Sequence, residues 1–289
     1  GRNISSNAAN IERPRYGPNG TSRVNFANIT QEVAGDACGV SDLPGGNVNA
    51  IKSNKSSAAY DYFGPEGWKT YAESVAFFEG SAGSVNNHGY MGMYQFGAAA
   101  MVSGGAIKED RLVVRLKESV RAMNSRGGKY EGYFKSQKEA DAWAVRCYTK
   151  QSDGTNDGSI CKAQKAGSSN KNNIKCCKQH ILSAYSNSDV WTESAKRNNV
   201  NSAQTFLQNP DYQGKVLIPF TSRKMQSLRK MGALGSVNNP AHVAGLLAAA
   251  HLRGEKNAAQ LAQQGLDKAD GNGTPASYYY KAIAQTMND

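Results

Sequence analysis

The sequence has no apolar run long enough to cross a bilayer. A membrane-spanning helix needs about 18 or more consecutive apolar residues, whereas the most apolar stretch, residues 243–252, is short and contains His251. The GxxxxGK[ST], HExxH and EF-hand signatures of nucleotide and metal sites are also missing. We therefore expect no transmembrane segment, no cofactor and no metal in a chain whose 289 residues suffice for one or two domains.

Acidic residues are few relative to basic ones. The 34 Lys and Arg against 23 Asp and Glu give a formal charge of +11. This charge favours a polyanionic partner: nucleic acid, an anionic membrane surface or an acidic cell-wall polymer. The lysine-rich stretch 162–178 lacks the interleaved aromatic side chains that stack on bases, so we do not expect nucleic acid to be the partner.

Cysteine is scarce, but its distribution is informative. Four of the five cysteines, Cys147, Cys161, Cys176 and Cys177, fall within about thirty residues. Because neighbouring cysteines pair with each other only with strain, we expect Cys176 and Cys177 to bond separately to Cys147 and Cys161. The sequence does not fix the order, and Cys38 is left over.

Two disulfides indicate an oxidising compartment, so a periplasmic or secreted protein is expected. The alternative is a zinc site built from these thiols and His180, which the lack of a CxxC pair disfavours. The chain starts at Gly1 with neither Met nor a signal-peptide pattern, and we expect it to be a mature or trimmed form.

Hydrophobic periodicity predicts a mainly α fold. Residues 1–63 are rich in Asn, Ser, Gly, Ala and Pro and predict an extended N-terminal arm, with Val24, Phe26 and Ile29 as anchors. Residues 81–97 predict turns and a short hairpin, and residues 150–175 a surface loop. Helices are expected over 68–79, 109–123, from Ser136, over 181–185, 203–207 and 225–231, from Pro240 to Gly254, and after Pro275.

Glu79 is the strongest candidate for chemistry. On a helical wheel for 68–79 it falls on the apolar arc with Trp68 and Phe78, whereas Glu73 points the opposite way. Burial against aromatic neighbours raises the pKa of a carboxyl group and enables it to donate a proton, as the general acid of glycoside cleavage does. The alternative is a structural Glu that bonds to backbone or to an Arg.

The residues after Glu79 carry a family resemblance. Glu79-Gly80-Ser81, Asn86, Gly89-Tyr90, Gly92 and Tyr94-Gln95-Phe96-Gly97 resemble the signature of the lysozyme-like superfamily. The match is to peptidoglycan lytic transglycosylases and to phage- or secretion-system-associated muramidases. The resemblance implies that Glu79 is the catalytic acid and that Gln95 lines the sugar cleft. The Glu-Ser pair of soluble lytic transglycosylases occurs here as Glu73-Ser74, which makes Glu73 the runner-up.

The resemblance continues over residues 238–287. Residues 245–254 resemble the helix that closes the cleft, although His251-Leu252-Arg253-Gly254 replaces the usual Ala-Tyr-Asn-Ala-Gly. His251, Tyr90, Tyr94 and Tyr279 are therefore expected substrate contacts, each with a core position as the alternative. The implied architecture is a lysozyme-like catalytic domain over 64–289, interrupted at about 125–236 by a Cys-containing helical insertion.

The resemblance implies cleavage of the β-1,4 bond between N-acetylmuramic acid (MurNAc) and N-acetylglucosamine (GlcNAc), with a single Glu and 1,6-anhydro-MurNAc ends. Hydrolysis, as in a lysozyme-type muramidase, is the alternative outcome. An alternative of another class is a non-catalytic, peptidoglycan-binding structural component. The arm and the insertion favour a partner assembly: a secretion apparatus, a conjugation system or a phage tail.

Overall fold

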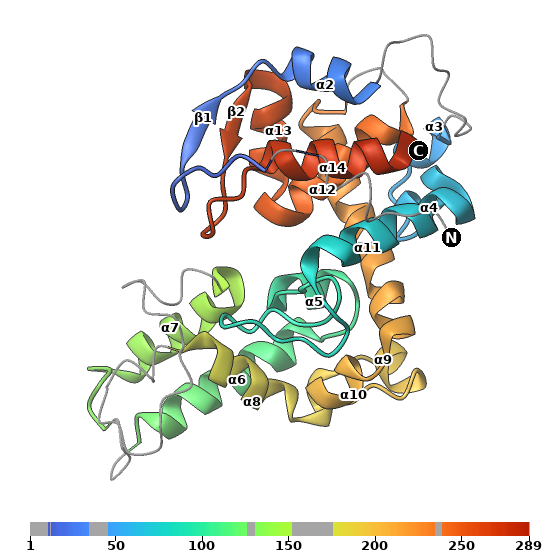
Figure 1. The fold of residues 1–289 in the computed structure, drawn as a ribbon. Coiled ribbons are helices and arrows are strands. Elements are labelled where there is room, and N and C mark those ends of the chain that lie inside the picture. The colour runs from blue at the N-terminus through green and yellow to red at the C-terminus, as the bar shows by residue number, and fades with distance from the viewer. Residues whose placement is uncertain are drawn as a thin grey trace. The chain divides into compact units, whose positions relative to one another are not determined.

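The structure is a computed structural model that describes Ile11 and residues 13–34, 46–125, 131–151, 176–234 and 239–288. Helices dominate it, which confirms the predicted mainly α class (Figure 1). The chain divides into two compact units: unit 1 comprises residues 1–78 and 218–289, and unit 2 comprises residues 79–217. These boundaries differ from the expected arm over 1–63 and insertion over 125–236.

Unit 1 combines both ends of the chain. It contains β1 (Thr21–Arg23), α2 (Phe26–Ala34), α3 (Val48–Ile51), most of α4 (Ala58–Glu79), the C-terminal part of α11 (Pro210–Lys230), α12 (Pro240–Arg253), α13 (Glu255–Gln264), β2 (Leu266–Lys268) and α14 (Ala276–Asn288). Its centre is α12, in which every residue from Val243 to Ala250 is buried. A helix that is apolar on all sides must be covered on all sides, and α13 and α14 supply much of that cover.

The helix α12 begins at Pro240, as predicted, and Asn239 is its N-cap residue. The side-chain oxygen of Asn239 accepts hydrogen bonds from the backbone N–H groups of Ala241 (2.9 Å) and His242 (3.3 Å). Pro240 occupies the first turn, where its missing N–H costs nothing. Gly254 ends the helix with φ of 80°.

The N-terminal segment is not an extended arm throughout, which corrects the expectation for residues 1–63. β1 pairs antiparallel with β2, Thr21 opposite Lys268. The α2 residue Ile29 is 7% exposed, and the ring of Phe26 lies 4.9 Å from that of Tyr280. Val24 donates its backbone N–H to Gly265. The few apolar residues of this segment find their partner surface at the other end of the chain, which local composition does not reveal.

Unit 2 is a set of short helices around a small aromatic core. It contains α5 (Ala98–Ser103), α6 (Glu109–Met123), α7 (Gln137–Thr149), α8 (Cys177–Tyr185), the 3₁₀ helix η3 (Ser188–Val190), α9 (Glu193–Arg197), α10 (Ala203–Leu207) and the first part of α11. The rings of Tyr185 and Phe206 lie 5.5 and 6.0 Å from that of the fully buried Trp191. The predicted helices 109–123 and 203–207 are confirmed at both ends.

Two proline-containing segments depart from expectation. The helix expected over 225–231 belongs to the 21-residue α11, whose first residue is Pro210, a position that proline favours. The helix ending at Glu79 was expected to start near Trp68, whereas helical structure extends back to Ala58. It passes a kink at Gly64, whose φ is 70°.

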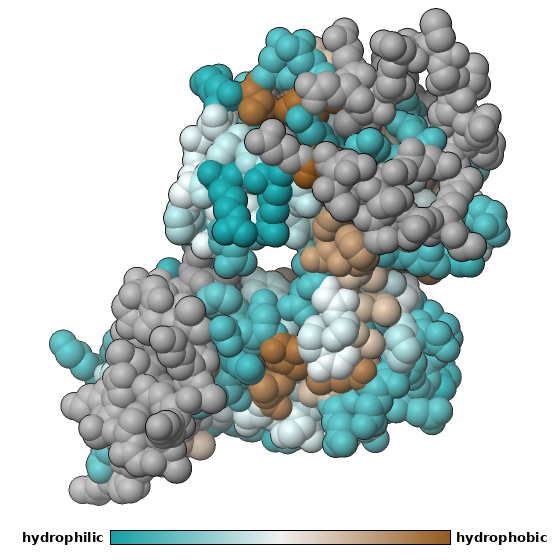
Figure 2. Space-filling model, viewed as in Figure 1, coloured by the Kyte–Doolittle hydropathy of each residue, from teal (hydrophilic) through white to brown (hydrophobic). Residues whose placement is uncertain are grey.

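The described surface is mostly hydrophilic. Its exposed large apolar side chains are Val48, Phe77, Val114 and Met231, and the face drawn in Figure 2 carries only small, separate hydrophobic patches. Within the described ranges, no helix has both the length and the apolar character needed to cross a membrane.

Candidate active site

Glu79 lies at the last position of α4, where the sequence pattern placed it. Its side chain is half-buried, whereas Glu73, one and a half turns earlier, is exposed. The preceding Phe78 is also half-buried, so the end of the helix is partly shielded from solvent. The local pattern favours Glu79 over Glu73 for chemistry that needs a carboxyl group shielded from bulk water.

Residues 81–97 form the predicted turns and hairpin. Isolated antiparallel bridges join Met91 to Val85 and to Phe96. The side-chain oxygen of Asn86 accepts hydrogen bonds from the backbone N–H groups of His88 (2.9 Å) and Tyr90 (3.0 Å), which is the Asx-turn geometry that Asn favours. The loop therefore has a defined shape without regular strands. Burial lowers the pKa of His88 within it.

Gln95 lies directly against the chain that follows Glu79. A Cβ placed on Gly80 would come within 2.9 Å of the Ser84 Oγ and 3.3 Å of the Gln95 Nε2, so a larger residue here would require these two side chains to shift. Gln95 Nε2 donates to Ser84 Oγ (2.9 Å) and to the carbonyl of Gly92 (2.9 Å). Gln95 itself has φ of 48°, which is uncommon for a residue other than glycine.

The amide oxygen of Gln95 is the group left for a ligand. The hydrogen bonds of the side chain to Ser84 and Gly92 both use its nitrogen, and within the described ranges the oxygen accepts no hydrogen bond. Because the nitrogen is held at two points, the oxygen has a fixed direction. A fixed acceptor close to Gly80, the residue after Glu79, can orient a hydroxyl or an acetamido N–H of a sugar.

Two buried glutamines hold the hairpin, and neither was identified from the sequence. Gln213, on α11, is fully buried; its Oε1 accepts the N–H of Met93 (2.8 Å), and its Nε2 donates to the carbonyls of Ala82 (3.1 Å) and Phe206 (2.9 Å). A Cβ on Gly92, whose φ is 80°, would lie 2.5 Å from that Oε1. The hairpin shape thus depends on a residue more than a hundred positions later.

Gln151 plays the same part at the other side of the hairpin. This side chain is 5% exposed. Its Oε1 accepts the N–H of Ala98 (2.7 Å), and its Nε2 donates to the carbonyl of His88 (2.8 Å). An isolated glutamine in a polar stretch gives no sequence signal that its amide will be buried.

The expected hairpin tyrosines differ in exposure. Tyr94 is 5% exposed, and its ring packs 5.6 Å from that of the buried Phe96, so it is a core residue of unit 2. Tyr90 is half-buried. Of the two hairpin tyrosines, Tyr90 is therefore the one whose side chain is partly exposed and could contact a ligand.

Tyr279 and His251 belong to unit 1. The Tyr279 ring lies 5.9 Å from the ring of Phe78, the residue before Glu79, and Tyr278 packs on the same ring at 6.1 Å. His251, half-buried on α12, makes an edge contact with Phe220 at 5.2 Å. Tyr279 is therefore tied to the end of α4.

The cysteines form a disulfide in unit 2, which argues against the alternative that these thiols bind zinc. Cys147 and Cys177 are bonded to each other, their Cα atoms 5.2 Å apart. Cys176 is also disulfide-bonded, and the expected partner Cys161 lies outside the described residues, as does Cys38. His180 is buried with its Nδ1 2.8 Å from the Ser119 hydroxyl.

In the ranges that the structure describes, no group of three or more His, Cys, Asp or Glu side chains gathers as metal ligands would. The disulfide is compatible with an oxidising compartment.

The structure brings together the chain at Glu79-Gly80, Ser84 and Gln95 within unit 2. It places Tyr279 on Phe78 within unit 1. Family models, curated proteins and solved structures were all compared with this chain, and none matches it.

Proposed function

We propose that the protein is a peptidoglycan-cleaving enzyme that acts on the MurNAc–GlcNAc β-1,4 bond as a lytic transglycosylase. The observation that carries the proposal is the seating of the Gln95 amide against Gly80, directly after Glu79. This contact connects the end of the helix that carries the acid with the hairpin that carries the glutamine. The resemblance to the lysozyme-like superfamily implies the same pair of elements, separated by a glycine-rich turn.

The proposed mechanism uses one carboxyl group. Glu79 protonates the glycosidic oxygen as the bond to the anomeric carbon of MurNAc breaks. The resulting carboxylate then removes the proton of the MurNAc 6-hydroxyl, whose oxygen attacks the anomeric carbon and closes the 1,6-anhydro ring. Gln95 Oε1 accepts a hydrogen bond from the sugar, and the substrate acetamido group shields the developing positive charge.

The distribution of acids supports this route over hydrolysis. The sequence has no Asp or Glu between Glu79 and Glu109, whereas most glycosidases need a second carboxylate across the bond. Later in the chain, Asp270 uses its Oδ1 to accept the N–H groups of Asn272 and Thr274, both at 2.8 Å. That is a structural turn in unit 1.

The test compares the parent protein with two matched variants on bacterial sacculi. Glu79→Gln keeps the side-chain volume but cannot donate the proton, and Glu73→Gln makes the same change on the exposed side of α4. We expect 1,6-anhydro muropeptides from the parent and from Glu73→Gln, and a loss of about a hundredfold or more from Glu79→Gln. Released products are identified by mass.

Other outcomes decide between the alternatives. Reducing ends from the parent would mean a hydrolytic muramidase. No release, with sacculus binding retained by the parent and both variants, would mean a peptidoglycan-binding structural component of a secretion, conjugation or phage-tail assembly. Loss of activity from Glu73→Gln alone would move the acid to Glu73. We place the protein in the periplasm or outside the cell, where its substrate lies.

A further inference from the structure

The excess positive charge of the chain is concentrated in one part of unit 2. Residues 108–178 contain 16 Lys and Arg but only 8 Asp and Glu, a surplus of 8 within a chain whose total formal charge is +11. This part includes α6, α7 and the start of α8. A surplus of this size in one contiguous segment distinguishes it from a uniformly basic surface.

Ion pairs engage the arginines of α6. Arg115 contacts both Asp189 (3.1 Å) and Glu118 (2.8 Å), and Arg121 contacts Asp141 (2.6 Å). Hydrogen bonds and charge from these partners raise the pKa values of both guanidinium groups. The α6 arginines therefore serve the packing of the unit.

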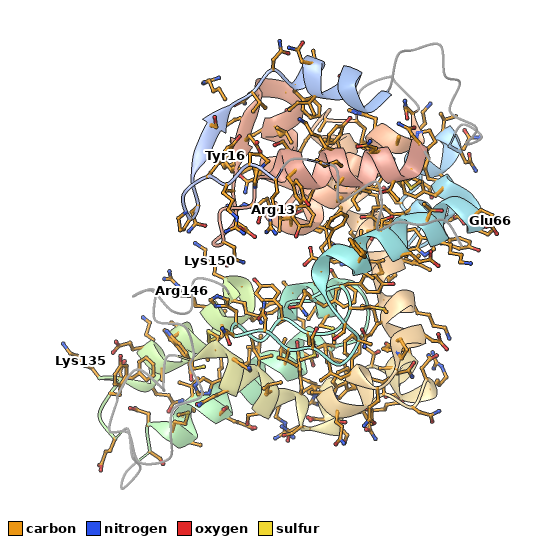
Figure 3. All side chains as sticks on the ribbon, viewed as in Figure 1. Arg13, Tyr16, Glu66, Lys135, Arg146 and Lys150 are labelled. Atoms are coloured by element: carbon orange, nitrogen blue, oxygen red, sulfur yellow. A yellow bond between two sulfur atoms is a disulfide. The ribbon has the colours of Figure 1, made fainter. Side chains whose placement is uncertain are left out.

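The basic residues of α7 are arranged differently. Lys138 and Arg146 lie eight positions apart, within a quarter turn of each other around the helix, and Lys150 is the C-cap residue four positions later. Lys135 lies two residues before the first residue of α7. All four are exposed, and Figure 3 shows the labelled side chains of Lys135, Arg146 and Lys150 projecting from this edge of the unit. We call these four residues the α7 basic stripe.

Within the described ranges, the lysines of the stripe form no ion pair. The nearest acids in sequence are engaged: Glu139 accepts the backbone N–H of Lys135 (2.9 Å), and Asp141 pairs with Arg121. Exposed Ala142 lies between Lys138 and Arg146 on the same face and adds no bulk. The stripe therefore runs about 12 Å along the helix from Lys138 to Arg146, at 1.5 Å per residue, and Lys150 extends it past the helix end.

The opposite face of α7 is anchored. Ala140, Ala144 and Cys147 are buried, and the Cys147–Cys177 disulfide joins α7 to α8. The stripe is thus displayed on a helix that is covalently fixed to its neighbour. A preorganised row of charges binds a polyanion with less loss of conformational entropy than a flexible basic tail does.

From this geometry we infer that the α7 basic stripe binds an extended anionic polymer of the cell envelope, whose acidic groups recur along one chain. The linear arrangement favours a polymer over a membrane surface, because the exposed face between the charges has no large apolar side chain to insert among lipids. It also has no exposed aromatic ring to stack on bases. The disulfide behind the stripe favours a partner in an oxidising compartment.

The experiment measures binding to poly(glycerol phosphate), a linear phosphodiester without bases. All proteins carry Glu79→Gln, so glycan cleavage cannot interfere, and the inference does not depend on Glu79 being catalytic. The stripe variant combines Lys135→Gln, Lys138→Gln and Lys150→Gln. The control combines Lys55→Gln, Lys69→Gln and Lys256→Gln, three exposed lysines of unit 1, with an identical change in net charge.

At low salt we expect the stripe variant to bind about tenfold more weakly or worse, the control to stay within about twofold, and the salt dependence to flatten only in the stripe variant. Equal losses in the two variants would overturn the inference, because binding would then follow net charge alone. So would stripe-dependent binding that is tighter for single-stranded DNA of equal phosphate number, or for phosphatidylglycerol vesicles, than for the polymer.

Discussion

The side-chain oxygen of Gln213 accepts a hydrogen bond from the backbone N–H of Met93, 2.8 Å away and 120 residues earlier in the chain. This contact ties the start of α11 to the hairpin that carries Gln95. The same side chain satisfies two carbonyl groups through its nitrogen. The shape of the candidate site is therefore set by a fully buried polar group whose hydrogen bonds go to the backbone of Met93, Ala82 and Phe206.

Replacing this glutamine should loosen the hairpin. We expect Gln213→Ala to lower the free energy of unfolding by about 2–3 kcal/mol, because three buried or partly buried backbone groups lose their partner. We also expect it to reduce sacculus cleavage, because Gln95 loses its fixed position. Gln204→Ala, on the exposed face of α10, is the control and should change stability by less than about 0.5 kcal/mol. Urea unfolding measures both, and similar behaviour of the two variants would contradict the bracing role.

The disulfide should stabilise unit 2 by closing a loop of about 30 residues. The sequence separation of Cys147 and Cys177 is 30, and loop-closure entropy for that length corresponds to about 3–4 kcal/mol. We expect Cys147→Ala combined with Cys177→Ala to unfold at correspondingly lower urea concentration. Replacing both together avoids an unpaired thiol that could exchange with Cys176. An unchanged midpoint would show that packing of α7 on α8 suffices.

The ion pair between Lys224 and Glu255 should make the stability of unit 1 depend on pH. Burial lowers the pKa of Lys224, and the nearby Glu255, whose Oε2 lies 3.3 Å from Nζ, opposes the shift. Glu255→Gln should therefore destabilise the protein at pH 7, by about 1–2 kcal/mol given the partial exposure of the pair. The cost should shrink toward pH 10, where the unpaired amine deprotonates.

The double change Glu255→Gln with Lys224→Met is the control for that prediction. It removes the buried charge as well as its partner, and the stability at pH 7 should recover relative to Glu255→Gln alone. In the parent, the native state binds fewer protons than the unfolded state between the lowered pKa and 10.5. The lysine therefore adds an increase in stability as the pH rises through that interval. Loss at pH 7 that persists unchanged at pH 10 would contradict the assignment.

His242 should make the stability of the protein depend on pH in the acid range. Burial lowers its pKa, and its Nδ1 lies 2.7 Å from the Tyr280 hydroxyl. The unfolded state therefore binds more protons below pH 6.5, and stability falls as the pH drops from there. We expect His242→Gln to flatten the decline in the urea midpoint between pH 7 and 5.

His88 is the matched comparison, since burial lowers its pKa as well but it belongs to unit 2. His88→Asn should remove only its own share of the acid sensitivity. If His242→Gln leaves the pH profile of the parent intact, protonation of His242 is not opposed by folding.

Elements with local signals were predictable, and those that depend on distant partners were not. Three features depend only on residues that are close together in the sequence. They are the periodicity of α6, the start of α12 at Asn239-Pro240 with its end at Gly254, and the end of α4 at Glu79. The strand β1 is stable only because β2 lies at the other end of the chain, and α13 was missed altogether.

The candidate site divides in the same way. The Glu79 helix end and the glycine-rich turn are local features, and the structure places Gln95 beside them. The burial of Gln151 and Gln213 could not be predicted, because their hydrogen-bond partners are backbone groups many residues away in the sequence. Tyr94 was expected either in the cleft, as a side chain that stacks on sugar rings, or in the core. Its burial against Phe96 depends on the aromatic core of unit 2, which the local sequence does not reveal.

The division of the chain has a consequence for how the protein is made. Unit 2 is continuous in sequence, whereas unit 1 needs residues from both ends, including β2 and α14. During synthesis the middle unit can complete its core as soon as α11 leaves the ribosome. The first 78 residues must wait for the last helix, exposing Phe26 and Ile29 in the meantime. Truncation at the C-terminus therefore removes the partner of the N-terminus as well, and a shortened chain leaves only the middle unit intact.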